Sequence, residues 1–155
     1  MRGGGENMNE IIENVINFVS KTFPKMYASL YLESLKAYVS DKNINRTQLR
    51  ALVFINNNGK ITMTDLCERL NIEKGSLTTM VDDLTHKGYL TRTRDLRDRR
   101  KYILNLTDEG KLISKDFLEV LGKKLESKFL NINEEDRKLF LESIKNLEQI
   151  LIKNN

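Results

Sequence analysis

The sequence predicts a mainly α-helical protein of the α+β class, built as a winged helix-turn-helix with N- and C-terminal dimerisation helices. Three observations predict this fold. Apolar residues recur at three- and four-residue spacings towards both ends of the chain, which is typical of amphipathic helices. Two short helical segments separated by a tight turn occupy the middle. Two strand-like segments follow them, and a strongly charged loop joins the two as a hairpin.

The N-terminal segment 8–40 has the periodicity of a helix, with Pro24 near its middle. Proline removes one backbone donor and clashes with the preceding turn, so we expect a kink or a break into two helices. Residues 1–7 are expected to form a flexible tail. Their glycine-rich, Arg-containing stretch resembles a translated ribosome-binding site, and we hypothesise that the natural start is Met8. A plain flexible tail is the alternative interpretation.

Capping signals mark the helices in the middle of the chain. Asn45 is followed three residues later by Gln48, and residues 62–65 repeat the spacing of a capping box. Gly88 is well suited to follow the last turn of a helix, where a positive φ is common. These signals, with the apolar pattern, predict helices over 46–56, 62–70 and 74–87.

Residues 89–94 and 101–106 have the character of strands, and the charged loop 95–100 connects them. Thr107 and Asn133 are placed to cap two further helices. The first of these is expected to run over 108–130 and the second to begin at residue 134. We therefore divide the chain into a tail (1–7), a winged helix-turn-helix lobe (41–107) and a helical dimerisation lobe (8–40 and 108–155).

Positive charge is concentrated in one segment of the chain. Hydrophobic residues make up 39% of the sequence, enough for an ordinary core, so a fully disordered chain is excluded. The net charge of the whole protein is only +4, and the segment 92–101 alone carries that excess, from six basic and two acidic residues. A local positive field of this kind is what nucleic-acid binding needs.

The predicted helix 74–87 has an outward face of small and hydroxylated residues, which permits close approach to a groove of duplex DNA. The same helical wheel places Asp82 and Asp83 on that outward face. A basic hairpin beside such a helix can follow the DNA backbone or enter the minor groove. The predicted DNA-binding residues are therefore Ser76, Thr78, Thr79, Arg92, Arg94, Arg97, Arg99 and Arg100.

An ordered set of short motifs spans residues 44–110. The motifs are Thr47-Gln48, Met63-Thr64-Asp65-Leu66, Gly75-Ser76-Leu77-Thr78, Val81-Asp82-Asp83-Leu84, Lys87-Gly88-Tyr89-Leu90, Asp95-Leu96-Arg97-Asp98-Arg99-Arg100 and Leu106-Thr107-Asp108-Glu109-Gly110. In this order they resemble the multiple-antibiotic-resistance regulator (MarR) family. The resemblance implies a homodimer held by the N- and C-terminal helices, with the winged lobes beside them.

The resemblance also implies roles for residues of the wing. Arg99 and Arg100 would lie in the wing, with one of them probing the minor groove of the DNA. Asp98, together with Asp95, would support the wing, Asp98 by a charge-assisted hydrogen bond that holds an arginine.

Two residues depart from the family pattern. Glu73 stands where the family often has a serine cap, so the recognition helix is expected to start differently. Asp83 stands where a basic residue is common, and an acid near DNA opposes contact with phosphate.

Other chemistry is poorly represented in the sequence. Cys67 is the only cysteine, which excludes an intrachain disulfide and favours a buried structural thiol in a cytoplasmic protein. His86 is the only histidine, so a zinc site and a metal cofactor are not expected. No nucleophile–base pair or carboxylate dyad has a recognisable context, and no apolar run approaches the length of a membrane span. We therefore expect neither an enzyme nor a membrane protein.

The leading hypothesis is a sequence-specific transcription regulator that binds double-stranded DNA at a pseudo-palindromic operator. By this hypothesis it is a repressor relieved by a small-molecule ligand. One alternative is a regulator without a ligand, controlled by its own abundance. Another is a winged-helix module used for protein contacts, but such a module has no need for the four arginines within residues 94–100.

Overall fold

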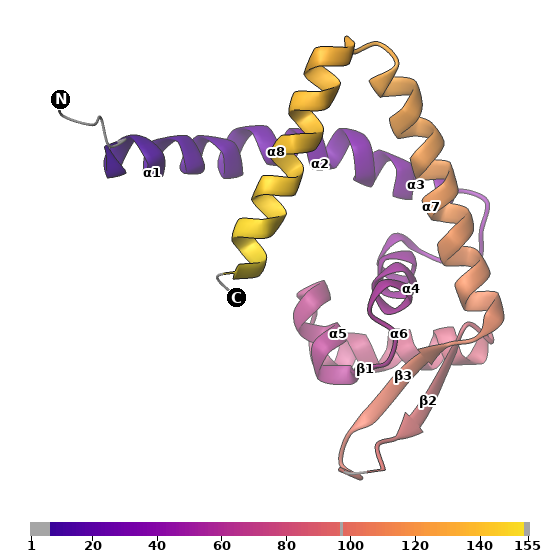
Figure 1. The fold of residues 1–155 in the computed structure, drawn as a ribbon. Coiled ribbons are helices and arrows are strands. Elements are labelled where there is room, and N and C mark those ends of the chain that lie inside the picture. Colours follow the sequence, from indigo (N-terminus) through magenta and orange to yellow (C-terminus); the bar gives the residue numbers. More distant parts are fainter. Residues whose placement is uncertain (1–6, 97, 154–155) are drawn as a thin grey trace, which may run out of the picture.

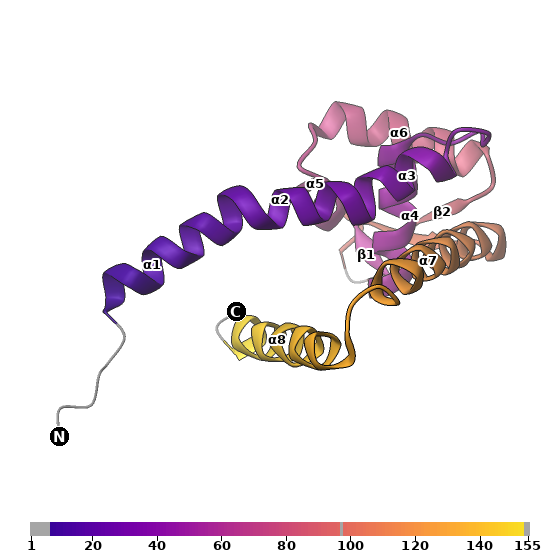
Figure 2. The same ribbon diagram turned by 90° about the horizontal axis from the view of Figure 1, so that it is seen from above.

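A nearly continuous helical run forms the N-terminal part of the molecule. The structure, a computed structural model, describes residues 7–96 and 98–153. Its first three helices are α1 (Met8–Asn17), α2 (Phe23–Tyr27) and α3 (Glu33–Tyr38), joined by π-helical turns at Phe18–Thr22 and Ala28–Leu32. Figures 1 and 2 show this run as one long rod that bends gently without a loop inside it.

The expected break into two helices at Pro24 does not occur. Pro24 is the second residue of α2 and follows directly after a π-helical turn. In that turn the Phe23 amide bonds to the Phe18 carbonyl, one residue further back than in an α-helix. The widened turn absorbs the missing proline donor, so the backbone passes Pro24 without ending the helix.

Both capping boxes expected in the middle of the chain are present. The amide of Gln48 donates to the Asn45 side chain at 2.9 Å, and the Asn45 amide donates back to the Gln48 side chain at 2.9 Å. Thr62 and Asp65 form the same reciprocal pair. The helices that begin at these positions and after the following turn are α4 (Arg46–Asn58), α5 (Met63–Leu70) and α6 (Lys74–His86).

Residues with positive φ turn the chain between these elements. Asn71 has a φ of 52° in the tight turn between α5 and α6, and Gly88 has a φ of 76° just after α6. Helix α4 runs two residues further than expected, because the Asn58 side chain donates to the Phe54 carbonyl and continues the last turn.

The wing is part of a three-stranded antiparallel sheet. The strands are β1 (Ile61–Thr62), β2 (Leu90–Arg94) and β3 (Tyr102–Leu106), in the order β1-β3-β2. The two-residue strand β1 pairs with β3, with Ile61 opposite Leu104. The register pairs Leu90 with Leu106 and Arg94 with Tyr102, so β2 and β3 form the hairpin that the sequence predicted.

Two long helices follow the wing. Helix α7 (Asp108–Phe129) begins at its predicted Thr107 cap and packs across α3 and α4. Helix α8 (Glu134–Lys153) begins after Asn133, whose side chain accepts from the Asp136 amide at 2.8 Å. Figure 1 shows α7 rising from the wing past the N-terminal rod to the top of the view, where the chain turns and α8 runs back down.

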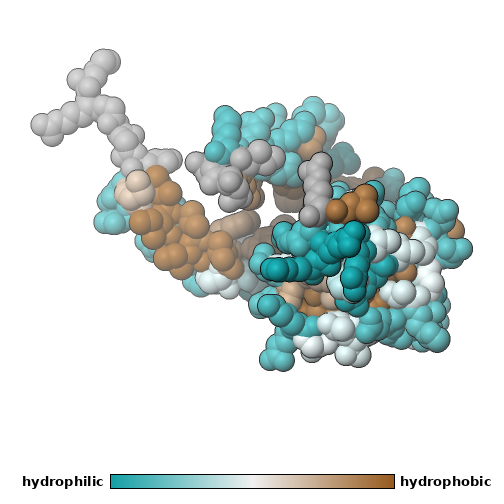
Figure 3. Space-filling model, turned by 90° about the horizontal axis from the view of Figure 1, so that it is seen from below, coloured by the Kyte–Doolittle hydropathy of each residue, from teal (hydrophilic) through white to brown (hydrophobic). Residues whose placement is uncertain are grey.

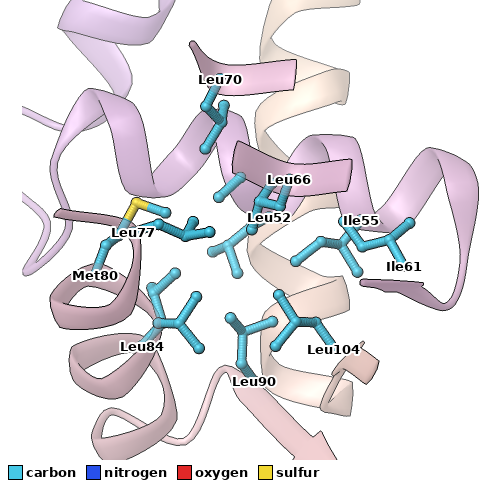
Figure 4. Close-up of a cluster of buried hydrophobic side chains, with 12 residues drawn as sticks. Leu52, Ile55, Ile61, Leu66, Leu70, Leu77, Met80, Leu84, Leu90 and Leu104 are labelled. Atoms are coloured by element: carbon cyan, nitrogen blue, oxygen red, sulfur yellow. The ribbon is translucent and has the colours of Figure 1, made fainter. Parts of the chain in front are cut away.

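The hydrophobic core consists of two clusters that share α4. The first lies inside the helix-turn-helix and wing, and Figure 4 shows its side chains converging from α4, α5, α6 and the sheet. The second joins α3, α4 and α7, with Phe117 packed edge-on against Tyr38 at 5.4 Å between ring centroids. The division of the chain into lobes stays a prediction, since α4 contributes side chains to both clusters.

Helices α1 and α8 carry large apolar side chains that this single chain leaves exposed. Figure 3 shows part of this surface as a brown strip along the N-terminal helix. No helix among the described residues has the length and apolar character needed to cross a membrane. The exposed residues on the two helices include Ile11, Ile12, Val15, Leu139, Ile144, Leu147 and Leu151, and Val19 in the π-helical turn after α1 is exposed as well.

Gly110→Ala should destabilise the protein. An added Cβ would meet the backbone carbonyl of Tyr89 well inside contact distance, so the start of α7 must shift. We expect a loss of about 1–3 kcal/mol in the free energy of unfolding, measured from urea titrations. Gly122→Ala, on the same helix with open space around it, is the control and should gain about 0.5–1 kcal/mol. Equal effects of the two substitutions would contradict the close contact.

Candidate nucleic-acid interface

The outward face of α6 is small and polar, as expected. Ser76, Thr78 and Thr79 are exposed, whereas Leu77, Met80, Val81 and Leu84 on the other side are buried. The Thr78 and Thr79 hydroxyls donate to carbonyls one turn back in the helix, at 3.0 and 3.2 Å. Their oxygens still have lone pairs that can accept from an external donor. The helix therefore offers a shallow surface with hydrogen-bonding groups.

Helix α6 begins without a side-chain cap. Glu73 is its N-cap residue, and its side chain makes no capping hydrogen bond. The backbone still closes the first turn, because the Leu77 amide donates to the Glu73 carbonyl at 2.9 Å. The departure from a serine cap thus changes the chemistry at the start of the helix and leaves its register intact.

The tip of the wing exposes cationic side chains. Arg94, Arg99, Arg100 and Lys101 are exposed, while Arg97 lies outside the described residues. Figure 3, which views the molecule from the side of α6 and the wing, shows this region as strongly hydrophilic.

Asp95 and Asp98 shape the wing through the backbone. The Asp95 side chain accepts from the Asp98 amide at 3.0 Å, and the Asp98 side chain accepts from the Arg100 amide at 3.1 Å. The Asp98 carboxylate also lies 3.9 Å from the Lys101 ammonium. These contacts hold the turn that carries Arg100, so the support that was expected from side-chain pairing reaches the arginine through its main chain.

Arg92 lies at the base of the wing, away from its tip. Its guanidinium is 3.8 Å from the centroid of the Tyr102 ring, and its Nη1 is 3.4 Å from the Asp82 carboxylate. Only 28% of its side chain is exposed. Arg92 was predicted to contact DNA, and its placement differs from that of the other wing arginines.

A cationic groove of about 270 Å³ lies between the helix-turn-helix and the wing. It brings together three predicted site residues, Thr78, Arg92 and Arg100. Lys74 and Lys101 also line it, although the sequence prediction left them out of the site. Their positions in the first turn of α6 and next to Arg100 were signals that could have included them. No carboxylate is among the described residues that line the groove, so it favours an anion.

Asp83 lies on the outward side of α6, where 42% of its side chain is exposed, but its carboxylate is also held by contacts within the protein. Its carboxylate accepts hydrogen bonds from the buried Gln48 of α4 and from Lys87, the latter at 2.6 Å. The Lys87 hydrogen bond, followed by that from Gln48, lowers the pKa of Asp83. Asp83 therefore ties α6 to the start of α4, and its charge is neutralised within the protein.

The remaining chemistry-bearing residues have structural surroundings. Cys67 is half-buried, and its thiol donates to the Ile72 carbonyl at 2.9 Å. Within residues 7–96 and 98–153, no group of three or more histidine, cysteine or acidic side chains could hold a metal ion. The helix-turn-helix, the cationic wing and the groove between them thus define the chain as a winged helix-turn-helix protein of the DNA-binding class.

Comparison with known proteins agrees with this class. The family model of the MarR family matches residues 42–101. The transcriptional regulator SarZ of Staphylococcus aureus (strain MRSA252) is 31% identical over 109 residues, which cover 70% of this chain and 72% of SarZ. This chain belongs to the MarR family.

Solved structures share the fold. The apo form of MarR from Escherichia coli has a TM-score of 0.64 at 26% identity, over 74% of this chain and 85% of MarR. FabT of Streptococcus pneumoniae, solved in complex with DNA, has a TM-score of 0.64 at 23% identity, over 93% of this chain and 99% of FabT. The family is one of transcriptional regulators, and this chain is a regulator rather than an enzyme.

Asp83→Asn should weaken the tie between α6 and α4 in a pH-dependent way. Because the folded pKa is lowered, the carboxylate stabilises the fold above its unfolded value of 3.8, and this contribution is lost as pH falls through the folded pKa. In urea titrations at pH 7 the free energy of unfolding should be larger for the parent than for the mutant. This difference in free energy should shrink below about pH 4. Glu119→Gln, at an exposed site on α7, is the control. A difference that does not vary with pH would contradict the ion pair.

Proposed function

We propose that this chain is a sequence-specific transcription regulator that binds double-stranded DNA as a homodimer. We further propose that it is a repressor relieved by a small molecule. One observation carries the DNA-binding proposal: the hydroxylated face of α6 and the cationic wing lie on the same side of the molecule, and none of the described residues that line the groove between them is a carboxylate. The DNA complex of FabT, a protein of the same fold, supports it.

The two parts of the interface have different tasks. Helix α6 enters the major groove, where Ser76, Thr78 and Thr79 reach base edges or position the helix. The arginines of the wing lie along the backbone and in the minor groove, whose negative potential attracts them. Phosphate contacts provide most of the affinity, and contacts to bases provide the sequence preference.

The homodimer is supported by the apolar surfaces of α1 and α8. Val15 of α1 and Val19 of the π-helical turn that follows it are 55% and 58% exposed, and Leu139 and Leu147 of α8 are 62% and 45% exposed. Contiguous apolar surface of this kind calls for a partner, and a second copy of the same chain supplies matching helices about a two-fold axis. We also propose that the dimer resides in the cytoplasm, because it acts on DNA and its cysteine is a free thiol.

The small-molecule site is proposed in a cleft of about 570 Å³ between the N-terminal rod, α4, α5 and α7. Tyr27, Tyr31 and Phe54 contribute aromatic surface, and Arg50 and Arg69 contribute the charge; no carboxylate is among the described lining residues. Burial is the largest effect on Tyr31 and raises its pKa, so its hydroxyl remains a donor. This lining favours an anion with an aromatic or apolar body.

Selection of bound duplexes from a random-sequence pool tests the proposed function. We expect recovered sequences with two-fold related half-sites about 10–10.5 base pairs apart, because two recognition helices must reach the same face of the DNA. Light scattering at micromolar concentration should give the mass of two chains. Recovery of no duplex above background would refute DNA binding, and a monomer mass or a single unsymmetrical half-site would refute the dimer.

Arg99→Ala and Arg100→Ala should each weaken binding to most duplexes. Loss of one phosphate contact should also lower the slope of log affinity against log salt by about one. Salt titrations with the selected duplex and a scrambled one provide the measurement. Thr79→Val is a control at a base-reading position, and it should alter sequence preference with an unchanged slope. If both arginine variants bind as the parent does, the wing does not contact DNA.

Aromatic carboxylates should raise the melting temperature of the protein more than their neutral amides do. The carboxylate can pair with Arg50 or Arg69 in the cleft, and a ligand that binds the native state raises its melting temperature. Thermal-shift measurements on the parent and on Arg50→Gln provide the check, with the variant expected to lose most of the shift. If no carboxylate stabilises the parent, the regulator that acts without a ligand is favoured.

A further inference from the structure

The strand register places Arg92 on the core-facing side of the wing. Side chains of a strand alternate between its two faces, so Arg92 shares a face with Leu90, and its register partner is Leu104. Both leucines are at most 1% exposed to solvent. Arg92 therefore lies at the edge of the hydrophobic core, on the same face of the hairpin as Leu90 and Leu104, instead of on its outer side.

The contacts of Arg92 all lie within the protein. Its guanidinium lies over the Tyr102 ring of β3 at 3.8 Å, within the range of a cation–π interaction. Its Nη1 pairs with Asp82 of α6 at 3.4 Å. Its Nε is buried and has no hydrogen-bond partner among the described residues. Arg92 thus bridges the recognition helix and the wing.

Arg94 provides a natural comparison two residues further along β2. It lies on the same face and pairs in register with Tyr102, but its guanidinium is 5.8 Å from the ring centroid. Its side chain is exposed. The two arginines thus share a strand and a nearby ring. Arg92 is held against the ring and Asp82, whereas Arg94 is exposed.

We propose that Arg92 is a positioning residue, which clasps the wing to α6, and not a phosphate contact. The clasp consists of Arg92, Tyr102 and Asp82. It fixes the angle between the recognition helix and the hairpin before DNA arrives, so the wing arginines and the outer face of α6 meet one duplex in register. This inference rests on the proposed DNA-binding function and assigns a different role to one of its predicted contact residues.

Lysine substitutions separate the two roles, because lysine keeps the charge and loses the planar group that stacks. A phosphate contact should survive Arg→Lys, whereas the clasp should not. We expect Arg92→Lys to bind the selected duplex roughly twofold to thirtyfold more weakly than the parent, with the parental salt slope. The matched control Arg94→Lys should bind like the parent, and Arg94→Ala should lower the slope by about one.

Variants of the ring test the same clasp without any change of charge. Tyr102→Phe keeps the ring face and should bind like the parent, and Tyr102→Leu should weaken binding as Arg92→Lys does. Parental affinity of Arg92→Lys, or a salt slope lowered by about one in that variant, would overturn the proposal. Circular dichroism would verify that each variant is folded. If Arg92→Lys does not fold, the affinity of Tyr102→Leu tests the clasp in its place.

A measurement without DNA distinguishes failure of the clasp from failure of the proposed function. In the full-length protein alone, amides of β2 and β3 should exchange hydrogen faster in Arg92→Lys and Tyr102→Leu than in the parent, and at the parental rate in Arg94→Lys. Equal exchange in all variants would show that no clasp holds the wing. Absence of DNA binding in the parent would refute the proposed function, and the hydrogen-exchange result would still test the clasp.

Discussion

The relative placement of the DNA-facing lobe and the N-terminal rod depends on α4, which packs into both hydrophobic clusters. Leu52 and Ile55 belong to the cluster inside the helix-turn-helix and wing, while Leu49 and Val53 belong to the cluster with α3 and α7. A helix is a rigid element, so these two sets of contacts fix the DNA-facing lobe relative to the N-terminal rod. Gln48 extends the connection, because the same side chain completes the α4 capping box and holds α6 through Asp83.

Local sequence signals were sufficient to predict most of the fold. Capping residues such as Thr107 and Asn133 act over three residues, and the positive φ of Gly88 follows from its place after a helix. Interactions of this range depend little on the rest of the molecule, which is why element boundaries came out within about two residues. Pro24 is the exception, because its effect depended on a π-helical turn that periodicity does not reveal.

The candidate site shows where such signals end. A helical wheel placed Asp83 outward, but it could not show that the Asp83 carboxylate accepts a hydrogen bond from Gln48, 35 residues earlier in the chain. For Arg92 a usable signal existed, since it has the same strand parity as Leu90 and so belongs to the inner face of the hairpin. Counting basic residues ignored that parity. Charge composition pointed to the wing as the candidate interface, but only the strand register distinguishes Arg92, which contacts Tyr102 and Asp82, from the exposed Arg94.

The aromatic residues of the N-terminal rod have a consequence for how this chain can vary. Phe18 and Phe23 are five residues apart, and their rings lie tilted against each other across a π-helical turn, with centroids 6.1 Å apart. Tyr27 and Tyr31 continue the row at four-residue steps with stacked rings. Each residue turns an α-helix by about 100°. Deleting a single residue between Phe18 and Phe23 would therefore rotate α1 by about that angle and carry its apolar stripe to another side. Chain length at this point is as much under constraint as residue type, so a one-residue gap here in an aligned relative marks a differently directed surface.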